Sequence, residues 1–133
     1  MKLIVAVDSE FGIGRAGKLA WHCPEDLAEF KRLTMGGVLA VGRHTYNGLP
    51  ALPGREVIMV GTGGVALCDL PSDCWICGGA GLYSSAEPLC DEMYLTVVEG
   101  LHNCDVFWKP GDGWKLVKEK GLARGVTQLH FVR

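Results

Sequence analysis

Short apolar runs, each followed by glycines or polar residues, mark the first two thirds of this chain. Residues 3–7, 38–41, 56–60 and 75–77 form largely apolar runs of strand length. Continuous runs of this kind, bounded by turn residues, are typical of strands that are buried on both faces. The pattern therefore predicts four buried strands.

One helix is predicted between the first two strands. Pro24 fits the first helical position, where its missing N–H costs no hydrogen bond, and Glu25 and Asp26 lie in the positive first turn. Apolar side chains recur at helical spacing after them, at Leu27, Phe30 and Leu33. Two glycines at positions 36–37 end the segment. Shorter helices are expected at 43–45 and 82–86.

The last third has a different pattern. Residues 93–98 read as a strand with two distinct faces, and further strands are expected near 114–118 and 127–132, separated by a turn-rich segment at 119–125. Strands that alternate with helices, followed by strands alone, indicate an α/β fold. We expect a single domain over residues 1–133, with a central mixed sheet that is mostly parallel, has an antiparallel C-terminal edge strand and is flanked by short helices.

Composition narrows the class of protein. The chain has 133 residues, 48% of them hydrophobic, with 13 Lys and Arg against 15 Asp and Glu, which is enough apolar material for a sizeable core. The lack of a basic run argues against a nucleic-acid binder. The first apolar run, residues 3–7, is too short for a signal peptide or a membrane span. A soluble cytoplasmic protein is expected.

Six cysteines are spread along the chain, mostly among apolar neighbours. Cys74 and Cys77 form a C-x-x-C pair, but no second pair follows at zinc-site spacing, and the pair lies inside an apolar run rather than at a strand-to-helix turn. The favoured interpretation is reduced thiols that act as small hydrophobic residues, with no metal site.

Glycine-rich turns follow all four predicted strands, at residues 12–21, 42–45, 61–64 and 78–81. In open α/β sheets ligands bind at the carboxyl ends of strands, and glycine lets the backbone approach a phosphate closely. Gly12, Gly14 and Gly17 match the G-x-G-x-x-G pattern, but the next helix begins only at Pro24, so the dinucleotide fingerprint is rejected. This segment is predicted instead to be a mobile loop that closes on a site.

Two positions are candidates for ligand binding. Arg43, with His44 and Thr45, could hold a phosphate at a helix start, and an arginine at this strand end favours NADP over NAD; the alternative is a solvated helix cap. Asp26 could face an apolar cleft and bind a planar amidine-like ligand edge, or it could simply point to water.

Together these segments resemble the dihydrofolate reductase family along nearly the whole chain. The loop that ends in Leu19-Ala20-Trp21 is similar to the family's substrate loop, and residues 23–34 (CPEDLAEFKRLT) are similar to its folate-binding helix. Four more motifs follow in family order: Gly42-Arg43-His44-Thr45-Tyr46, Leu52-Pro53-Gly54-Arg55, Cys77-Gly78-Gly79-Ala80 with Tyr83, and Tyr94-Leu95-Thr96. The glycine pair of the third motif corresponds to an unusual cis bond in the family.

The resemblance implies an enzyme of tetrahydrofolate biosynthesis and one-carbon metabolism that reduces 7,8-dihydrofolate to 5,6,7,8-tetrahydrofolate with NADPH. It implies that Asp26 binds the pterin and promotes protonation of N5, through water near Trp21, with Thr96 as hydrogen-bonding partner. The implied substrate-binding residues are Val5, Ala6, Leu27, Phe30, Lys31, Leu49, Arg55 (on the glutamate carboxylate) and Thr96. The implied cofactor-binding residues are Ala6, Ile13, Gly14, Gly17, Leu19, Gly42, Arg43, His44, Thr45, Thr62, Cys77, Gly78, Gly79, Ala80, Gly81, Leu82 and Tyr83.

The chain departs from the family pattern between Val60 and Trp75, where the family usually has another helix and strand on the adenosine side of the cofactor. Thr62 is left for the usual hydroxyl contacts, and Gly81 stands where some relatives carry an arginine. Weakened adenosine binding is therefore expected.

Two alternative functions stay open: a pyrimidine reductase of riboflavin synthesis on the same fold, and a catalytically idle pterin-binding or structural homologue. The expected partners are dihydrofolate and NADPH. The chain is expected to be a monomer, with an oligomer as the alternative.

Overall fold

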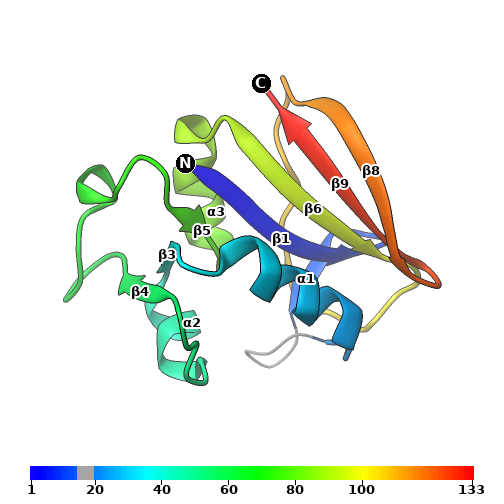
Figure 1. Ribbon diagram of the computed structural model, residues 1–133, viewed down its shortest axis with the longest axis horizontal. Coiled ribbons are helices and arrows are strands. Elements are labelled where there is room, and N and C mark those ends of the chain that lie inside the picture. The colour runs from blue at the N-terminus through cyan, green and yellow to red at the C-terminus, as the bar shows by residue number, and fades with distance from the viewer. Residues whose placement is uncertain (15–19) are drawn as a thin grey trace.

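A seven-stranded sheet forms the centre of the computed structural model, which describes residues 1–14 and 20–133 (Figure 1). The strand order is β4-β3-β5-β1-β6-β9-β8, so the N-terminal strand lies in the middle. The strands are β1 (Lys2–Asp8), β3 (Val38–Val41), β4 (Glu56–Met59), β5 (Trp75–Ile76), β6 (Glu92–Val98), β8 (Lys115–Ala123) and β9 (Val126–Val132). A separate antiparallel ribbon pairs β2 (Gly12–Gly14) with β7 (Val106–Phe107).

The five strands from β4 to β6 run parallel, whereas β9 is antiparallel to β6 and β8 is antiparallel to β9. The predicted α/β class, with a mostly parallel sheet and antiparallel pairing at the C-terminal edge, is confirmed. Parallel strands are covered on both faces, which explains why they appear in the sequence as continuous apolar runs.

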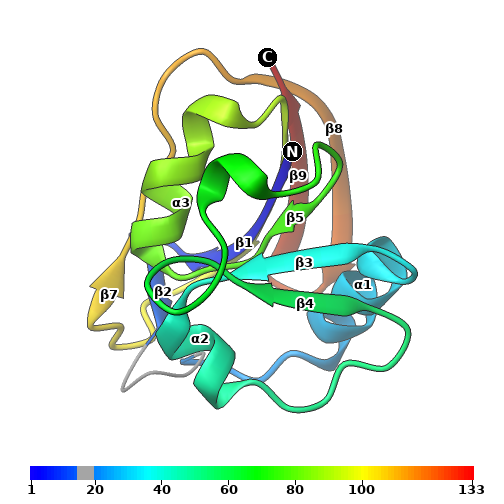
Figure 2. The same cartoon turned by 90° about the vertical axis from the view of Figure 1, so that its left-hand side faces the viewer.

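Helices cover both faces of the sheet. They are α1 (Pro24–Thr34), α2 (Arg43–Gly48) and α3 (Ala80–Ala86), together with the short 3₁₀ turns η1 (Leu67–Asp69) and η2 (Glu87–Leu89). Figure 2 shows α1 and α3 on opposite sides of the sheet, with α2 near the ends of β3 and β4. Among the described residues, no helix is long and apolar enough to cross a membrane.

Helix α1 begins and ends as its sequence predicts. Pro24 is its first residue and the acidic Glu25 and Asp26 occupy its first turn. The chain leaves the helix through Gly36, whose φ of +79° is a conformation that favours glycine. The N–H of Gly36 then donates to the carbonyl of Gly54 at 2.8 Å, so the end of α1 is joined to the turn before β4.

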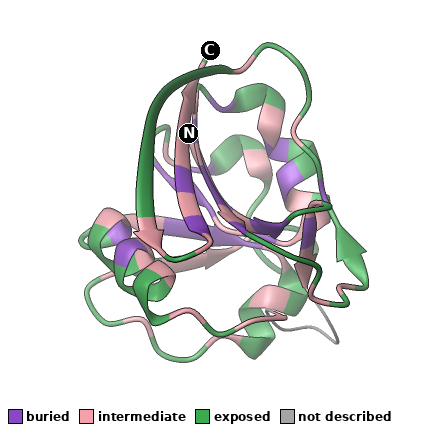
Figure 3. Cartoon of the chain, turned by 90° about the vertical axis from the view of Figure 1, so that its right-hand side faces the viewer, coloured by how far each residue is buried: buried purple, intermediate pink, exposed green. Residues whose placement is uncertain are grey.

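The core consists of two apolar clusters, one on each face of the sheet. The larger cluster, on the α3 side, is built around Leu3, Val5, Ile76 and Met93, while the smaller, on the α1 side, centres on Ile4, Leu39 and Trp75. Burial in Figure 3 accordingly concentrates on the central strands and falls off towards β8. Successive residues of β1 alternate between the two clusters, as the two-residue period of a strand requires.

Two sequence interpretations need correction. Residues 119–123 are not a turn but the second half of β8, and only Arg124 and Gly125 connect β8 to β9. The polar residues and glycine of this segment are tolerated because β8 is an exposed edge strand. Of the six free cysteines, Cys74 and Cys90 are buried as predicted, whereas Cys68 is exposed and does not contribute to the core.

The short segment between β4 and β5 leaves β4 at the edge of the sheet. Val60 and Val65 form an isolated parallel bridge, and η1 follows before the chain enters β5. Figure 1 shows this segment as a loop that extends beyond β4.

Candidate functional site

Asp26 and Thr96 are brought together from α1 and β6. The hydroxyl of Thr96 hydrogen-bonds to the carboxyl group of Asp26. Thr96 is 3% exposed and pairs in register with Ala6 of β1, close to the carboxyl ends of both strands. The arrangement places one carboxyl group over the middle of the sheet, where the parallel strands end.

The carboxyl group of Asp26 is partly removed from water, and this raises its pKa above the ordinary value of 3.8. Burial is the largest cause, the hydrogen bond from Thr96 acts in the opposite direction, and the negative charge of Glu29 raises the pKa further. In the structure Asp26 therefore does not simply point to water, the second of the two possibilities for this residue.

Trp21 lies just before α1 and supplies a buried donor. Its indole N–H makes no hydrogen bond to the described part of the chain, although the atom is fully buried. An unpaired buried donor costs roughly 1–3 kcal/mol, which a ligand or an ordered water can recover. The indole ring packs edge-on against His102, with 5.4 Å between ring centroids, which fixes its orientation.

One side of the site is formed by α1 and the segment that follows α2. Phe30 packs against the smaller core cluster, while Leu27, 47% exposed, has a largely free side chain. Leu49 follows α2 and is half-buried, and Arg55, also half-buried, donates from Nε to the carbonyl of Pro53 at 3.3 Å. Lys31 is exposed on α1.

The glycine turns after β3 and β5 meet at a second part of the site. The N–H of Gly42 donates to the carbonyl of Gly78 at 2.8 Å. The peptide bond between Gly78 and Gly79 is cis, as the resemblance implies. A Cβ atom built on Gly79 would lie 3.7 Å from Oγ1 of Thr45, so these two turns and the first turn of α2 are neighbours.

A hollow of about 650 Å³ opens beside these turns. Its lining is small and mostly apolar, and it combines the ends of β3 and β4 with α3: Gly42, Val60, Gly61, Gly64, Ala66, Leu67, Gly81, Leu82 and Ser85. Arg43 is exposed next to it, and its guanidinium donates to the carbonyl of Thr62. His44 and Thr62 are exposed as well.

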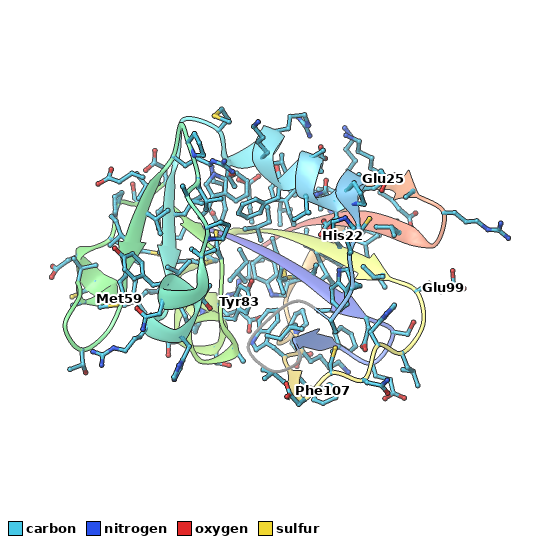
Figure 4. All side chains as sticks on the ribbon, turned by 90° about the horizontal axis from the view of Figure 1, so that it is seen from below. His22, Glu25, Met59, Tyr83, Glu99 and Phe107 are labelled. Atoms are coloured by element: carbon cyan, nitrogen blue, oxygen red, sulfur yellow. The ribbon has the colours of Figure 1, made fainter. Side chains whose placement is uncertain are left out.

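The remaining predicted site residues are distributed over the same end of the molecule. Figure 4 shows this end from below, with His22 and Glu25 at the start of α1 and Tyr83 on the other side of β1. Tyr83 is buried, and its hydroxyl donates to the carbonyl of Ile4 at 2.8 Å. Val5 is buried on the α3 side, so its side chain does not face α1.

Ala6, Ile13, Gly14, Cys77 and Ala80 are half-buried near these elements. The predicted closing loop lies only partly in the structure, because Gly17 and Leu19 fall outside the described residues.

Sequence reasoning missed the burial of Glu29, a charged residue of α1. Glu29 is 6% exposed and contacts Arg32 on α1 and Lys120 on β8. Its spacing of three residues after Asp26, on the same side of the helix, could have indicated it.

Replacing Thr96 by valine should raise the pKa of Asp26 further, because valine has a similar shape but cannot donate the hydrogen bond that lowers this pKa. When the pKa of an acid is higher in the folded than in the unfolded state, the free energy of unfolding is unaffected well below pH 3.8. It falls as the pH rises from there through the folded-state pKa. The variant should therefore lose stability towards neutral pH, relative to the unmodified chain. Carbon-13 NMR of the aspartate carboxyls, with urea unfolding at acid and neutral pH, measures both effects. An unchanged pKa of Asp26 would contradict the assigned hydrogen bond.

The chain is similar to known proteins of one family. The profile of the family described as Dihydrofolate reductase matches residues 1–70. Dihydrofolate reductase type 9 of Escherichia coli is 34% identical over 98% of this chain and 90% of its own length. Dihydrofolate reductase of Bacillus subtilis is 30% identical over 90% of this chain and 83% of its own.

The solved structure of dihydrofolate reductase from Enterococcus faecalis, complexed with NADP(H) and RAB-propyl, superposes with a TM-score of 0.88. It is 26% identical in sequence, and the match covers 99% of this chain and 95% of that one. The family profile, the relatives and the solved structure agree with one another, and the chain belongs to the dihydrofolate reductase family.

Proposed function

We propose that Asp26 is the residue through which this member of the dihydrofolate reductase family binds the pterin and promotes its protonation. The reaction is the reduction of 7,8-dihydrofolate to 5,6,7,8-tetrahydrofolate with NADPH. The observation that carries the assignment to Asp26 is its half-buried carboxyl group, which is hydrogen-bonded to Thr96.

A carboxylate suits the edge of a pterin ring. The ring presents two adjacent N–H groups, and a carboxylate has two oxygens that can accept both hydrogen bonds. Partial burial strengthens these bonds because little water competes for the donors. The hydrogen bond from Thr96 limits the rotation of the Asp26 carboxyl group and fixes its orientation. Leu27 and Phe30, on the same helix, provide apolar surface for the flat ring.

Protonation of N5 requires an acid that holds a proton near neutral pH. Burial raises the pKa of Asp26 in that direction. The buried N–H of Trp21 can bind and orient a water molecule between Asp26 and the ring, which would give the proton a path. Arg55 would bind the glutamate carboxylate of the substrate with two parallel hydrogen bonds, since its guanidinium presents a planar pair of donors.

The residues on the other side of β1 fit NADPH. The hollow of about 650 Å³ is lined by glycines, and a Cβ atom added at Gly81 would meet nothing within 4 Å. Backbone can therefore approach a phosphate closely there. Thr45 and Arg43, in the first turn of α2, would contact phosphate oxygens, and Gly78 and Gly79 would lie near the nicotinamide. When bound, NADPH supplies the hydride for C6 of dihydrofolate.

The adenosine part of NADPH should bind weakly, because residues 61–67 after β4 offer one side-chain hydroxyl, that of Thr62, among glycine and apolar residues. Loss of one charge-assisted hydrogen bond corresponds to a roughly tenfold or larger rise in the dissociation constant. Fluorescence titration should therefore give a higher NADPH dissociation constant than that of the Enterococcus faecalis enzyme. Reduced nicotinamide mononucleotide, which lacks adenosine, is the control and should bind both proteins alike. An NADPH constant as low as that of the relative contradicts this proposal.

Asp26→Asn should lower the rate of dihydrofolate-dependent NADPH oxidation by about 10²–10⁴-fold, because the amide keeps the shape but cannot deliver a proton. Glu25→Gln is the matched control: it removes a carboxylate from the neighbouring exposed position of the same helical turn and should leave the rate within about twofold. Equal rates for Asp26→Asn and the unmodified enzyme would refute the role of Asp26. Folate binding without turnover in the unmodified protein would instead indicate an idle binding protein.

A further inference from the structure

Another carboxylate, more deeply buried than that of Asp26, lies one helical turn further along α1. Glu29 is 6% exposed although it belongs to an amphipathic surface helix. Its carboxylate forms two hydrogen bonds with Arg32, from Nε at 2.6 Å and Nη2 at 2.9 Å. Oε2 also accepts a hydrogen bond from Nζ of Lys120 at 3.2 Å. One carboxylate is therefore shared by two cations from different elements.

The contact with Lys120 joins α1 to the far edge of the sheet. Lys120 belongs to β8, the edge strand, and is separated from Glu29 by 91 residues of sequence. Figure 3 shows α1 lying beside the lower part of β8. Because a helix can roll on a smooth apolar face, a directional polar contact of this kind restricts the rotation of α1.

We propose that Glu29 is a positioning residue for the reaction: its ion pairs with Arg32 and Lys120 fix α1, and with it Asp26, on the sheet and balance the charge beside Asp26. This inference rests on the proposed role of Asp26. Glu29 itself does not touch the substrate in this proposal and acts through its neighbour.

The groups around the two carboxyls define the electrostatics. Glu29 faces Arg32 on its own helix, Lys120 on β8 and the hydroxyl of Tyr94 on β6. The two cations hold the pKa of Glu29 below its ordinary value, with Arg32 contributing most, so Glu29 is ionised at neutral pH. Asp26 accepts a hydrogen bond from Thr96 on β6 and lies near the negative charge of Glu29. Tyr83, buried on the α3 side of β1, interacts with Asp26 only through space.

The sign of each substitution follows from this charge balance. Replacing Glu29 by glutamine removes a negative charge near Asp26 and leaves the two cations unpaired, so ionised Asp26 is favoured and its pKa falls. Replacing Lys120 by glutamine leaves the charge of Glu29 less compensated, so the pKa of Asp26 rises. A purely structural role would loosen α1 in both variants and move the two pH profiles in the same direction or not at all.

The test is the pH profile of hydride transfer, measured by stopped flow on the complex with NADPH and dihydrofolate. For Glu29→Gln the inflection should move to lower pH, so that one unit above the original inflection the rate falls by roughly threefold. For Lys120→Gln the inflection should move to higher pH, and the double variant should lie between the two. Lys118→Gln, an exposed lysine on the same strand, is the control and should not move the profile.

Each outcome decides the inference separately from the proposed function. Opposite shifts of the two single variants support the charge balance; parallel shifts or unchanged profiles overturn it. Thermal unfolding of each variant identifies any that fails to fold, and Glu29→Asp, which keeps the charge on a shorter side chain, should retain the original inflection if it folds. If Asp26→Asn keeps the full rate and the same pH profile, then the proposed role of Asp26 fails, whatever the Glu29 variants show.

Discussion

The hydrogen bond between Thr96 and Asp26 connects α1 to the middle of the central sheet. Thr96 is fixed by the sheet, through its register with Ala6, and Asp26 is carried by α1, which packs over the same face. A carboxyl group in that position is partly desolvated, which raises its pKa, and is oriented at the same time. The position of this carboxyl group lowers the free energy of unfolding, because an ionised carboxylate is less stable when partly buried than when it is fully solvated.

Strand β1 separates the two binding regions. In the proposed function, Asp26 and Phe30 belong to the substrate region on the α1 side, where the ion pair of Glu29 with Lys120 joins their helix to β8. On the opposite side, the hydroxyl of Tyr83 donates to the carbonyl of Ile4, which attaches α3 to the middle of β1. The glycine turns after β3 and β5 then meet at the carboxyl ends of the strands, as expected for a ligand that spans an open α/β sheet.

The sequence predicts those strands and helices whose formation depends on neighbouring residues. The buried parallel strands and α1 follow from apolar runs, helical spacing, Pro24 and the glycines at 36–37, and the order of motifs indicates the family. The second half of β8 was not predicted, because an edge strand tolerates charged residues that resemble a turn. The burial of Glu29 was not predicted either, since its partner Lys120 is remote in the sequence. The residue roles at the site follow from the family resemblance more than from any single pattern.

The central claim is that Asp26 binds the pterin ring. It is tested most directly by a crystal structure of this protein with folate and NADP⁺ bound. The account predicts that both carboxylate oxygens of Asp26 lie within hydrogen-bonding distance of the pterin edge, with Thr96 still bonded to Asp26 and Arg55 at the glutamate carboxylate. A pterin ring bound elsewhere, with the Asp26 carboxyl group making no contact to it, would contradict the account.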